Sequence, residues 1–244
     1  MTSLSLFVLS LTQAITEFIP VSSSGHLTLI QSWFGLVPSL GLDVFLNTAT
    51  LVSVSLYFYP RLRALISWWL PLIVGSLPAA LAALIFGDQI ESAFSSTAIL
   101  PYSFFLTSVF LFSTRFIKPS TKPLTLTRAL IIGLFQAVAI LPGVSRSGAT
   151  IFAGLLVGLS PASAFQFSFG LFVPASLGAI FLKRDLLVAL GLTPLQSFLS
   201  FALTAALGFL ALRVLERVVT SHRLWIFGIY TFLLSLILFV IGKP

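Results

Sequence analysis

The stretch that decides the fold reads Gln13-Ala-Ile-Thr-Glu-Phe-Ile-Pro-Val-Ser-Ser-Ser-Gly-His26. Parts of it return as Gln136-Ala137 and as Val144-Ser-Arg-Ser-Gly148, each 123 positions after its first occurrence. An offset of about half the chain indicates an internal duplication. Both copies interrupt an apolar run with proline, glycine and hydroxyl residues. Paired interruptions of this kind in the two halves of a membrane protein predict a binding site where the copies meet.

The composition is typical of a membrane protein. Hydrophobic residues make up 58% of the chain and charged residues 8%, whereas soluble domains carry about 25% charged residues. Apolar runs at 99–112, 195–212 and 224–241 approach or reach the roughly 20 residues that cross a bilayer. The chain has no cysteine, which excludes disulfides and thiolate metal sites. We therefore predict an all-α integral membrane protein that forms one compact helical domain.

The apolar pattern divides the chain into two repeats of the same plan, residues 1–117 and 118–244. Each repeat is predicted to hold one helical hairpin and three transmembrane spans. The hairpins are re-entrant, because neither 4–19 nor 26–37, at about 1.5 Å per residue, reaches across a hydrocarbon core of about 30 Å. The predicted hairpins are 4–37 and 128–159, and the predicted spans are 42–59, 64–86, 97–117, 161–182, 195–218 and 224–242.

Counting the spans predicts the topology. A re-entrant hairpin does not change sides, and the odd number of spans between the two hairpins makes the repeats inverted. Nine basic residues lie at one predicted face, and only Lys183, Arg184 and Lys243 lie at the other. The nine are Arg61, Arg63, Arg115, Lys118, Lys122, Arg128, Arg213, Arg217 and Arg223. The positive-inside rule places their face in the cytoplasm, with both termini and the mouth of the first hairpin outside. This rule accounts for the net charge of +7 without a nucleic-acid partner.

The first hairpin tip carries a carboxylate, hydroxyls and an imidazole. Gln13 and Glu17 are four residues apart and share a helix face. Ser22 and Ser23 precede His26 by four and three residues, so both hydroxyls are expected near the imidazole if helical geometry begins there. Glu17 could serve as a base, and His26 could change protonation near neutral pH.

The second tip carries Ser145, Arg146, Ser147 and Thr150. An arginine inside a membrane costs several kcal/mol and needs compensation, either from Glu17 or from an anionic ligand. Each turn leads into a helix N-terminus, which favours anions. Two such termini, several hydroxyls and one guanidinium predict a site for phosphate or pyrophosphate.

Each residue also has a structural interpretation. Ser24 and Ser147 are as well explained as helix caps, and Gln13 as a helix-packing amide. A purely structural ion pair of Glu17 with Arg146 is the less favoured alternative. Two polar residues on the next span are assigned no chemistry. We interpret Asp43 as a helix N-cap and Asn47 as a packing residue, with the lining of a cavity as the alternative for Asn47.

The two motifs resemble those of a known family. Gln13–His26 is similar to the (E/Q)xxxE and PVSSxGH motifs of the bacterial undecaprenyl-pyrophosphate phosphatases, the bacitracin-resistance membrane family. The stretch Pro142–Thr150 is similar to that family's PGxSRSGAT motif. The motifs are long, stand in the family's order, and extend the resemblance over essentially the whole chain.

The resemblance implies hydrolysis of undecaprenyl pyrophosphate to undecaprenyl phosphate, which recycles the lipid carrier of cell-wall synthesis. It implies a site that opens to the periplasmic side of the plasma membrane and depends on a divalent cation, Mg²⁺ or Ca²⁺. By motif position, Glu17 falls on the acidic residue of metal binding or activation, and Gln13 stands where many members have a glutamate ligand. Ser23 and His26 fall on candidate nucleophile and acid–base positions, and neither is preferred as nucleophile.

Arg146 falls on the pyrophosphate clamp, and the hydroxyls of Ser22, Ser145, Ser147 and Thr150 are the further candidates for phosphate binding. The alternative function is a transporter or flippase for a phosphorylated polyprenyl lipid, since inverted repeats with helix ends at the midplane are a transporter architecture. The expected partners are the lipid substrate, the bilayer and, in a homodimer, a second copy of the chain.

Overall fold

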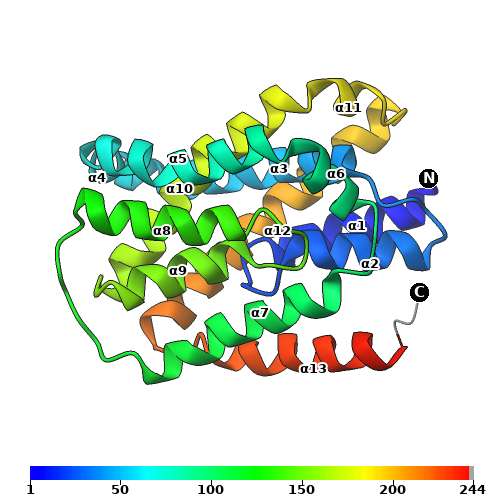
Figure 1. Cartoon of the computed structure of the whole chain (residues 1–244). Helices are drawn as coiled ribbons and strands as arrows, with labels where there is room; N and C mark the ends of the chain where they lie inside the picture. The colour runs from blue at the N-terminus through cyan, green and yellow to red at the C-terminus, as the bar shows by residue number, and fades with distance from the viewer. Residues whose placement is uncertain (242–244) are drawn as a thin grey trace.

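Helices account for most of residues 1–241, the part of the chain that the computed structural model describes, and this part contains no strand (Figure 1). Residue 242 of the last predicted span and Lys243 lie outside the described residues. Within the described residues, three helical segments are long and apolar enough to cross a membrane: Leu40–Arg61, Pro161–Leu182 and Pro194–Thr220. The bent pair Trp69–Ile85 and Gly87–Phe94 makes a fourth if it counts as one span.

The first hairpin consists of α1 (Ser3–Thr16) and α2 (Ser23–Trp33), and the second of α8 (Leu126–Val138) and α9 (Arg146–Leu156). The helix that leaves each tip begins after a serine cap. The Ser22 hydroxyl accepts from the Gly25 N–H at 3.4 Å, and the Ser145 hydroxyl accepts from the Gly148 N–H at 3.1 Å. The duplicated sequence therefore repeats the same cap.

The other α-helices lie in the regions between and after the hairpins. They are α3 (Leu40–Phe58), α4 (Leu62–Ser67), α5 (Trp69–Ile85), α6 (Gly87–Phe94), α7 (Leu100–Ser113), α10 (Pro161–Leu182), α11 (Arg184–Val188), α12 (Pro194–Thr220) and α13 (Ile226–Ile241). Short 3₁₀ turns follow α3 (Tyr59–Arg61) and α7 (Thr114–Phe116).

The predicted span at 64–86 is not one helix. The chain breaks at Trp68 between α4 and α5, and it bends by 82° between α5 and α6. Pro71, in the first turn of α5, has no N–H to continue the ladder from α4, which explains the first break. The predicted span at 97–117 appears as α7, with 14 residues, and a 3₁₀ turn. Such a helix is about 21 Å long, shorter than a hydrocarbon core.

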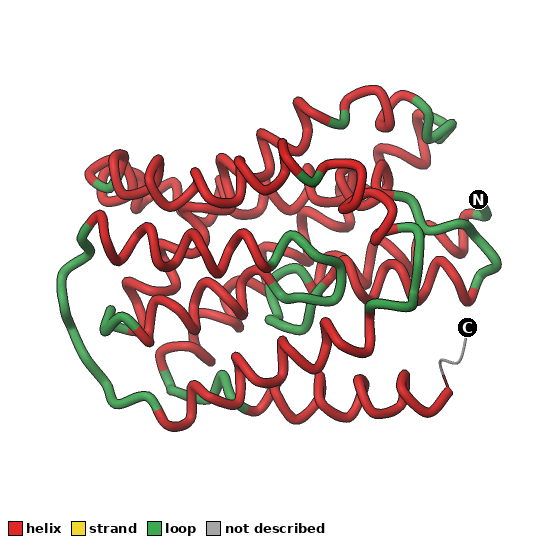
Figure 2. The backbone as a smooth tube through the Cα atoms, in the orientation of Figure 1, coloured by secondary structure: helices red, strands yellow, loops and turns green. Residues whose placement is uncertain are grey.

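The two hairpins enter the molecule from opposite ends, and their tips lie together in its centre (Figure 1). Figure 2 shows both tips as loops surrounded by helices. The two hairpins are packed in a corresponding way. α12 packs on α1 of the first hairpin, and α5 packs on α8 of the second, while α7 packs on α13. The α5–α8 contact needs glycine, because a Cβ on Gly133 would lie 2.3 Å from the carbonyl oxygen of Gly75.

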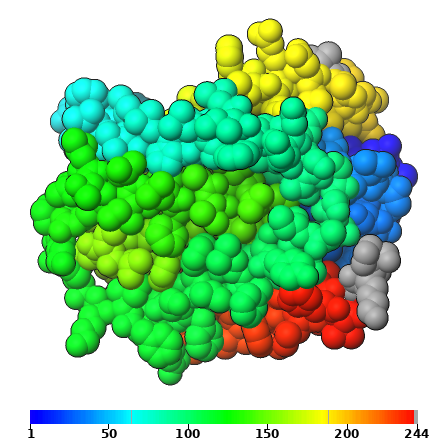
Figure 3. Space-filling view, in the orientation of Figure 1, coloured from blue at the N-terminus to red at the C-terminus, as the bar shows by residue number. Residues whose placement is uncertain are grey.

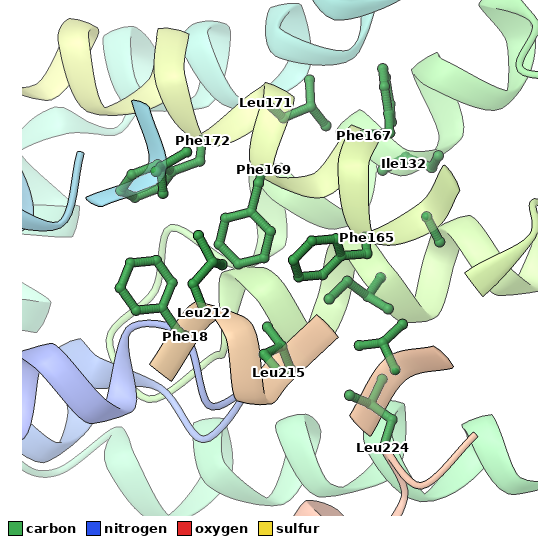
Figure 4. Close-up of a cluster of buried hydrophobic side chains, with 14 of the residues drawn as sticks. Phe18, Ile132, Phe165, Phe167, Phe169, Leu171, Phe172, Leu212, Leu215 and Leu224 are labelled. Carbon is green, nitrogen blue, oxygen red and sulfur yellow. The ribbon is translucent and has the colours of Figure 1, made fainter. Parts of the chain in front are cut away.

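The main apolar core centres on α10 and α12 and also includes residues of α3, α8, α9 and the first tip (Figure 4). It includes Phe165, Phe169 and Phe172 of α10, Leu212 of α12, and Phe18 beside the tip. The space-filling view shows the face of the molecule formed by α5 and α6, with α8 on one side of them and α10 and α11 on the other (Figure 3). The core therefore joins the long helices to the residues that follow Glu17.

Hydroxyl groups link helices inside the molecule. Ser53 of α3 donates to the Ala205 carbonyl of α12 at 2.7 Å, and Ser235 of α13 donates to the Pro101 carbonyl of α7 at 2.8 Å. The outer surface carries large apolar side chains such as Leu4, with 65% of its surface exposed. Polar groups between helices and apolar groups outside are the arrangement that a lipid environment favours.

Candidate functional site

The two tips touch through their backbones. A Cβ on Gly25 would lie 2.8 Å from the Cα of Gly143, so no larger residue fits between the tips at this position. Gly143 has φ of +89°, a conformation that favours glycine. Thr107 of α7 fixes the second tip, since its hydroxyl donates to the Gly143 carbonyl and accepts from the Ser145 N–H, both at 2.9 Å. The close approach brings the polar groups of both copies into one place.

An ion pair joins the two tips. The Arg146 guanidinium donates to Oε1 of Glu17, and its Cζ lies 3.9 Å from the centre of the Phe172 ring. The side chains are 19% and 6% exposed for Arg146 and Glu17, respectively. Glu17 is therefore one source of the compensation that a buried arginine requires, as the sequence suggested.

The other oxygen of Glu17 accepts two more hydrogen bonds. The Ser23 hydroxyl donates to Oε2 at 2.5 Å, and the Gln13 amide donates to the same atom at 3.0 Å. The α1 face that carries Gln13 and Glu17 thus positions the carboxylate, and the first residue of α2 supplies the hydroxyl. A serine hydroxyl that donates to a buried carboxylate is the arrangement of a nucleophile with its base.

His26 contacts α13 and the cap of α2. Its Nε2 is 2.7 Å from the Tyr230 hydroxyl of α13, and its Nδ1 is 2.7 Å from the backbone carbonyl of Ser22. The expected proximity of the Ser22 and Ser23 hydroxyls to the imidazole does not produce a hydrogen bond among the described residues, since the partners of His26 are a carbonyl and Tyr230. Ser22 is the cap, with φ of +71°, so its carbonyl faces the imidazole while its hydroxyl accepts from the Gly25 N–H. The Ser23 hydroxyl points to Glu17 instead.

Two cavities of about 180 and 200 Å³ meet at the tips, and we call them the first and second tip cavities. Both are lined by Glu17, Ser23, Ser24, Asn47 and Arg146. Gln13 and Asp43 line only the first, and Ser22, Gln136, Ser145 and Ser147 line only the second. Because the first residues of α2 and α9 line these cavities, the positive ends of both helix dipoles face the same space.

An apolar cavity of about 350 Å³ adjoins the tip cavities, between α3, α5, α6, α8 and α10. Its walls are mostly alanine, leucine and isoleucine side chains. Phe94 of α6 lines this apolar cavity and both tip cavities. Polar and apolar spaces therefore share a wall.

Two predicted phosphate ligands differ in position. Ser147 lines the second tip cavity, as does Ser145, whose hydroxyl is also the cap of α9. Thr150 is buried behind the tip, where its hydroxyl lies 2.6 Å from the Ser168 hydroxyl and donates to the Arg146 carbonyl at 2.8 Å. Among the described residues, neither Thr150 nor His26 is part of a tip-cavity wall.

Unpartnered buried polar atoms gather at the cavities. In residues 1–241, buried side-chain atoms without a hydrogen-bond partner occur in Thr28, Asp43, Gln136 and Ser176. All except Thr28 line a tip cavity. Because an unpaired buried polar atom costs about 1–3 kcal/mol, its partner is expected to be a ligand or water.

Sequence reasoning missed Asp43. The cap of α3 is Ser39, whose hydroxyl accepts from the Leu42 N–H at 3.4 Å, and Asp43 lies one turn later. Gln31 contacts one carboxylate oxygen of Asp43 at 3.5 Å, and the other oxygen has no partner. Asn47 lines both tip cavities, which is the alternative and not the favoured packing interpretation. The spacing of Asp43 and Asn47, four residues apart on an apolar helix, was the available signal.

The donor set suits a hard cation. No group of three or more His, Asp or Glu side chains that could hold a metal occurs within residues 1–241. The first tip cavity nevertheless offers the carboxylates of Glu17 and Asp43 and the amide of Asn47. Oxygen ligands of this kind are those that Mg²⁺ and Ca²⁺ prefer, and phosphate oxygens of a substrate complete such a shell.

Comparison with known proteins gives one consistent result. The family model of bacitracin resistance protein BacA matches residues 6–237. A relative from Thermosipho africanus, named undecaprenyl-diphosphatase, is 36% identical over 251 residues, covering 96% of this chain and 98% of the relative. Relatives of the same name from Methanococcus maripaludis strain C7 and Thermotoga sp. strain RQ2 are both 34% identical. They cover 93% and 96% of this chain and 96% and 99% of their own lengths.

Proposed function

Because the chain belongs to the BacA family of bacitracin resistance proteins, we propose that it hydrolyses undecaprenyl pyrophosphate to undecaprenyl phosphate and inorganic phosphate. This reaction recycles the lipid carrier for cell-wall synthesis. A transporter for a phosphorylated lipid is not favoured, because the relatives carry the name of a hydrolase. The observation that carries the proposal is the 2.5 Å hydrogen bond from Ser23 to Glu17, on the carboxylate that also holds Arg146.

Ser23 is the proposed nucleophile. Its oxygen attacks the terminal phosphorus and forms a phosphate ester, while the bond from that phosphorus to the bridging oxygen breaks and undecaprenyl phosphate leaves. Oε2 of Glu17 accepts the Ser23 proton. Water then cleaves the phosphoserine and releases inorganic phosphate. His26 is less suited to attack, because its two ring nitrogens are occupied by Ser22 and Tyr230.

Arg146 and the two helix N-termini hold the diphosphate in this proposal. Arg146 presents a guanidinium to both tip cavities, and Ser22, Ser145 and Ser147 add polar groups around the second. Thr150 acts indirectly, by holding the first turn of α9 through the Arg146 carbonyl. Oriented dipoles and one fixed cation stabilise the charge that develops on the phosphoryl oxygens.

A divalent cation, Mg²⁺ or Ca²⁺, fits the first tip cavity. Glu17 and Asp43 would hold it, and the unpartnered oxygen of Asp43 is the observation that favours this placement. The cation would neutralise negative charge on the phosphates. The Gln13 amide N–H donates to Glu17, which supports a positioning role beside the metal-binding role expected from the sequence.

The two halves are proposed to be inverted repeats, with the termini and the site opening on the periplasmic side of the plasma membrane. Two observations support this orientation. The hairpins enter from opposite ends, and α4 and the basic loop before α8 lie at the end opposite the start of α1 (Figure 1). A reporter enzyme that is active only in the cytoplasm should be active when it is fused to the loop at 118–125. The homodimer stays a prediction, which the mass of the protein in detergent tests.

Phosphate release by the purified protein tests the function. Wild-type protein in detergent with undecaprenyl pyrophosphate and Mg²⁺ or Ca²⁺ is expected to release inorganic phosphate, and Glu17→Ala and Ser23→Ala should release it at least about a hundredfold more slowly. Absence of release by the wild type with either cation would refute the hydrolase. Full turnover by both variants would refute the assignment of these residues while the activity stands.

A further inference from the structure

Gln136 is a buried amide without a partner. Gln136 is 2% exposed, and among the described residues neither its amide nitrogen nor its amide oxygen has a hydrogen-bond partner. It lies in the last turn of α8, just before the second tip. A buried amide in this state is costly unless something outside the described chain completes its hydrogen bonds.

The duplication explains why the partner is missing. The counterpart of Gln136 in the first copy is Gln13, which donates to Glu17 four residues later. The second copy has Ile140 at the position that corresponds to Glu17. The amide is retained in the second copy although the carboxylate that occupies it in the first copy is absent.

The place of Gln136 indicates what it meets. The second tip cavity and the apolar cavity share a wall of Ala79, Phe94, Gln136, Ile140 and Ala175. Gln136 is the one residue with a polar side chain among these described residues. A ligand that extends from the second tip cavity into the apolar cavity therefore passes the Gln136 amide. The amide lies at the boundary between the polar and the apolar part of such a ligand.

We propose that Gln136 binds the phosphate that stays on the lipid, beside the ester oxygen that joins it to the polyprenyl chain. The inference rests on the proposed function, because a lipid diphosphate has its polar-to-apolar junction at this phosphate. The terminal phosphate lies at Ser23 and Arg146, and the first isoprene units extend into the apolar cavity. The amide N–H of Gln136 donates to an oxygen of the proximal phosphate, which makes Gln136 a specificity residue for lipid-linked phosphates.

Two glutamines provide a matched test. Gln136→Met keeps the length of the side chain and removes its hydrogen bonds. Gln31→Met makes the same change at a buried glutamine whose amide is partnered by the Leu27 carbonyl, Asp43 and the Ser39 N–H. Without ligand, Gln136→Met should unfold at the wild-type temperature or above, and Gln31→Met should unfold at a lower temperature. Equal losses in both variants would assign Gln136 a structural role and overturn the proposal.

Ligand binding supplies the second readout. Farnesyl monophosphate, which carries only the proximal phosphate, should bind Gln136→Met about tenfold to a hundredfold more weakly than wild type by ligand-induced thermal shift. Inorganic phosphate, as an inhibitor of phosphate release, should bind both proteins equally. Unchanged farnesyl monophosphate affinity, or equal weakening of both ligands, would overturn the proposal. Absence of phosphate release by wild type would refute the hydrolase alone, since farnesyl monophosphate binding still reports on Gln136.

Discussion

The ion pair between the tips makes a quantitative prediction. Glu17→Gln leaves the Arg146 guanidinium buried without its counter-charge. Arg146→Met likewise leaves the Glu17 carboxylate buried without its counter-charge. Removing one partner of a buried pair costs about 3–5 kcal/mol. For a chain of this length, each kcal/mol lowers the unfolding temperature by about 2–4 °C, so each single variant should lose roughly 6–20 °C.

The double variant isolates the interaction. With Gln at 17 and Met at 146 no unpaired charge remains, so its loss should be smaller than the sum of the single losses by about 1–3 kcal/mol. Unfolding in detergent can be followed by the fluorescence of the four tryptophans. Phosphate release should be absent in all three variants, because each of them lacks the Glu17 base, the Arg146 phosphate ligand or both.

A second ion pair provides the control. Lys183 donates to Glu91 at 2.5 Å, but their side chains are 28% and 45% exposed. Glu91→Gln should therefore cost less than about 1 kcal/mol. If the single losses at Glu17 and Arg146 simply add, or if each is as small as that of Glu91→Gln, the tips are not joined by this pair and the reasoning fails.

Three further variants probe the tips. Ser23→Ala should lower kcat for phosphate release by about 10²–10⁴-fold and by more than Ser24→Ala, which removes a hydroxyl from the same cavities without touching Glu17; equal effects would contradict the nucleophile. Gly25→Ala should cost about 1–3 kcal/mol in thermal unfolding, because its Cβ would lie 2.6 Å from the Phe104 ring. Tyr230→Phe keeps the contact between His26 Nδ1 and Ser22 and should lose less activity than His26→Ala; an equal loss in the two turnover assays would show that the Tyr230 contact is the one that matters.

Local signals predicted the tips well. The turns before each glycine indicated that helices begin there, but the caps are Ser22 and Ser145, two positions before the expected candidates Ser24 and Ser147. The cost of an unpaired arginine in a membrane indicated that Arg146 needs a partner and left Glu17 and an anionic ligand as candidates; the structure shows the pair with Glu17. These features depend on residues close in sequence or on one strong charge, which explains why a single sequence reveals them.

Other features depend on contacts that no local pattern contains. The imidazole of His26 pairs with Tyr230, a residue 204 positions later, and not with a group of the first tip motif other than the Ser22 carbonyl. The position of Gln136 in a cavity wall depends on α5, α6 and α10, which no pattern around residue 136 contains. The span predicted at 64–86 rested on its apolar run alone, and the break at Trp68 is explained by Pro71 in the first turn of α5.

The account is tested most directly by a structure of the protein with a methylene-bridged diphosphonate analogue of the lipid, which cannot be hydrolysed. The terminal phosphonate is predicted between the Ser23 hydroxyl and the Arg146 guanidinium, with the apolar chain passing Gln136. A diphosphonate bound away from both tips, with the Glu17–Arg146 pair unchanged and Ser23 out of reach of phosphorus, would contradict it.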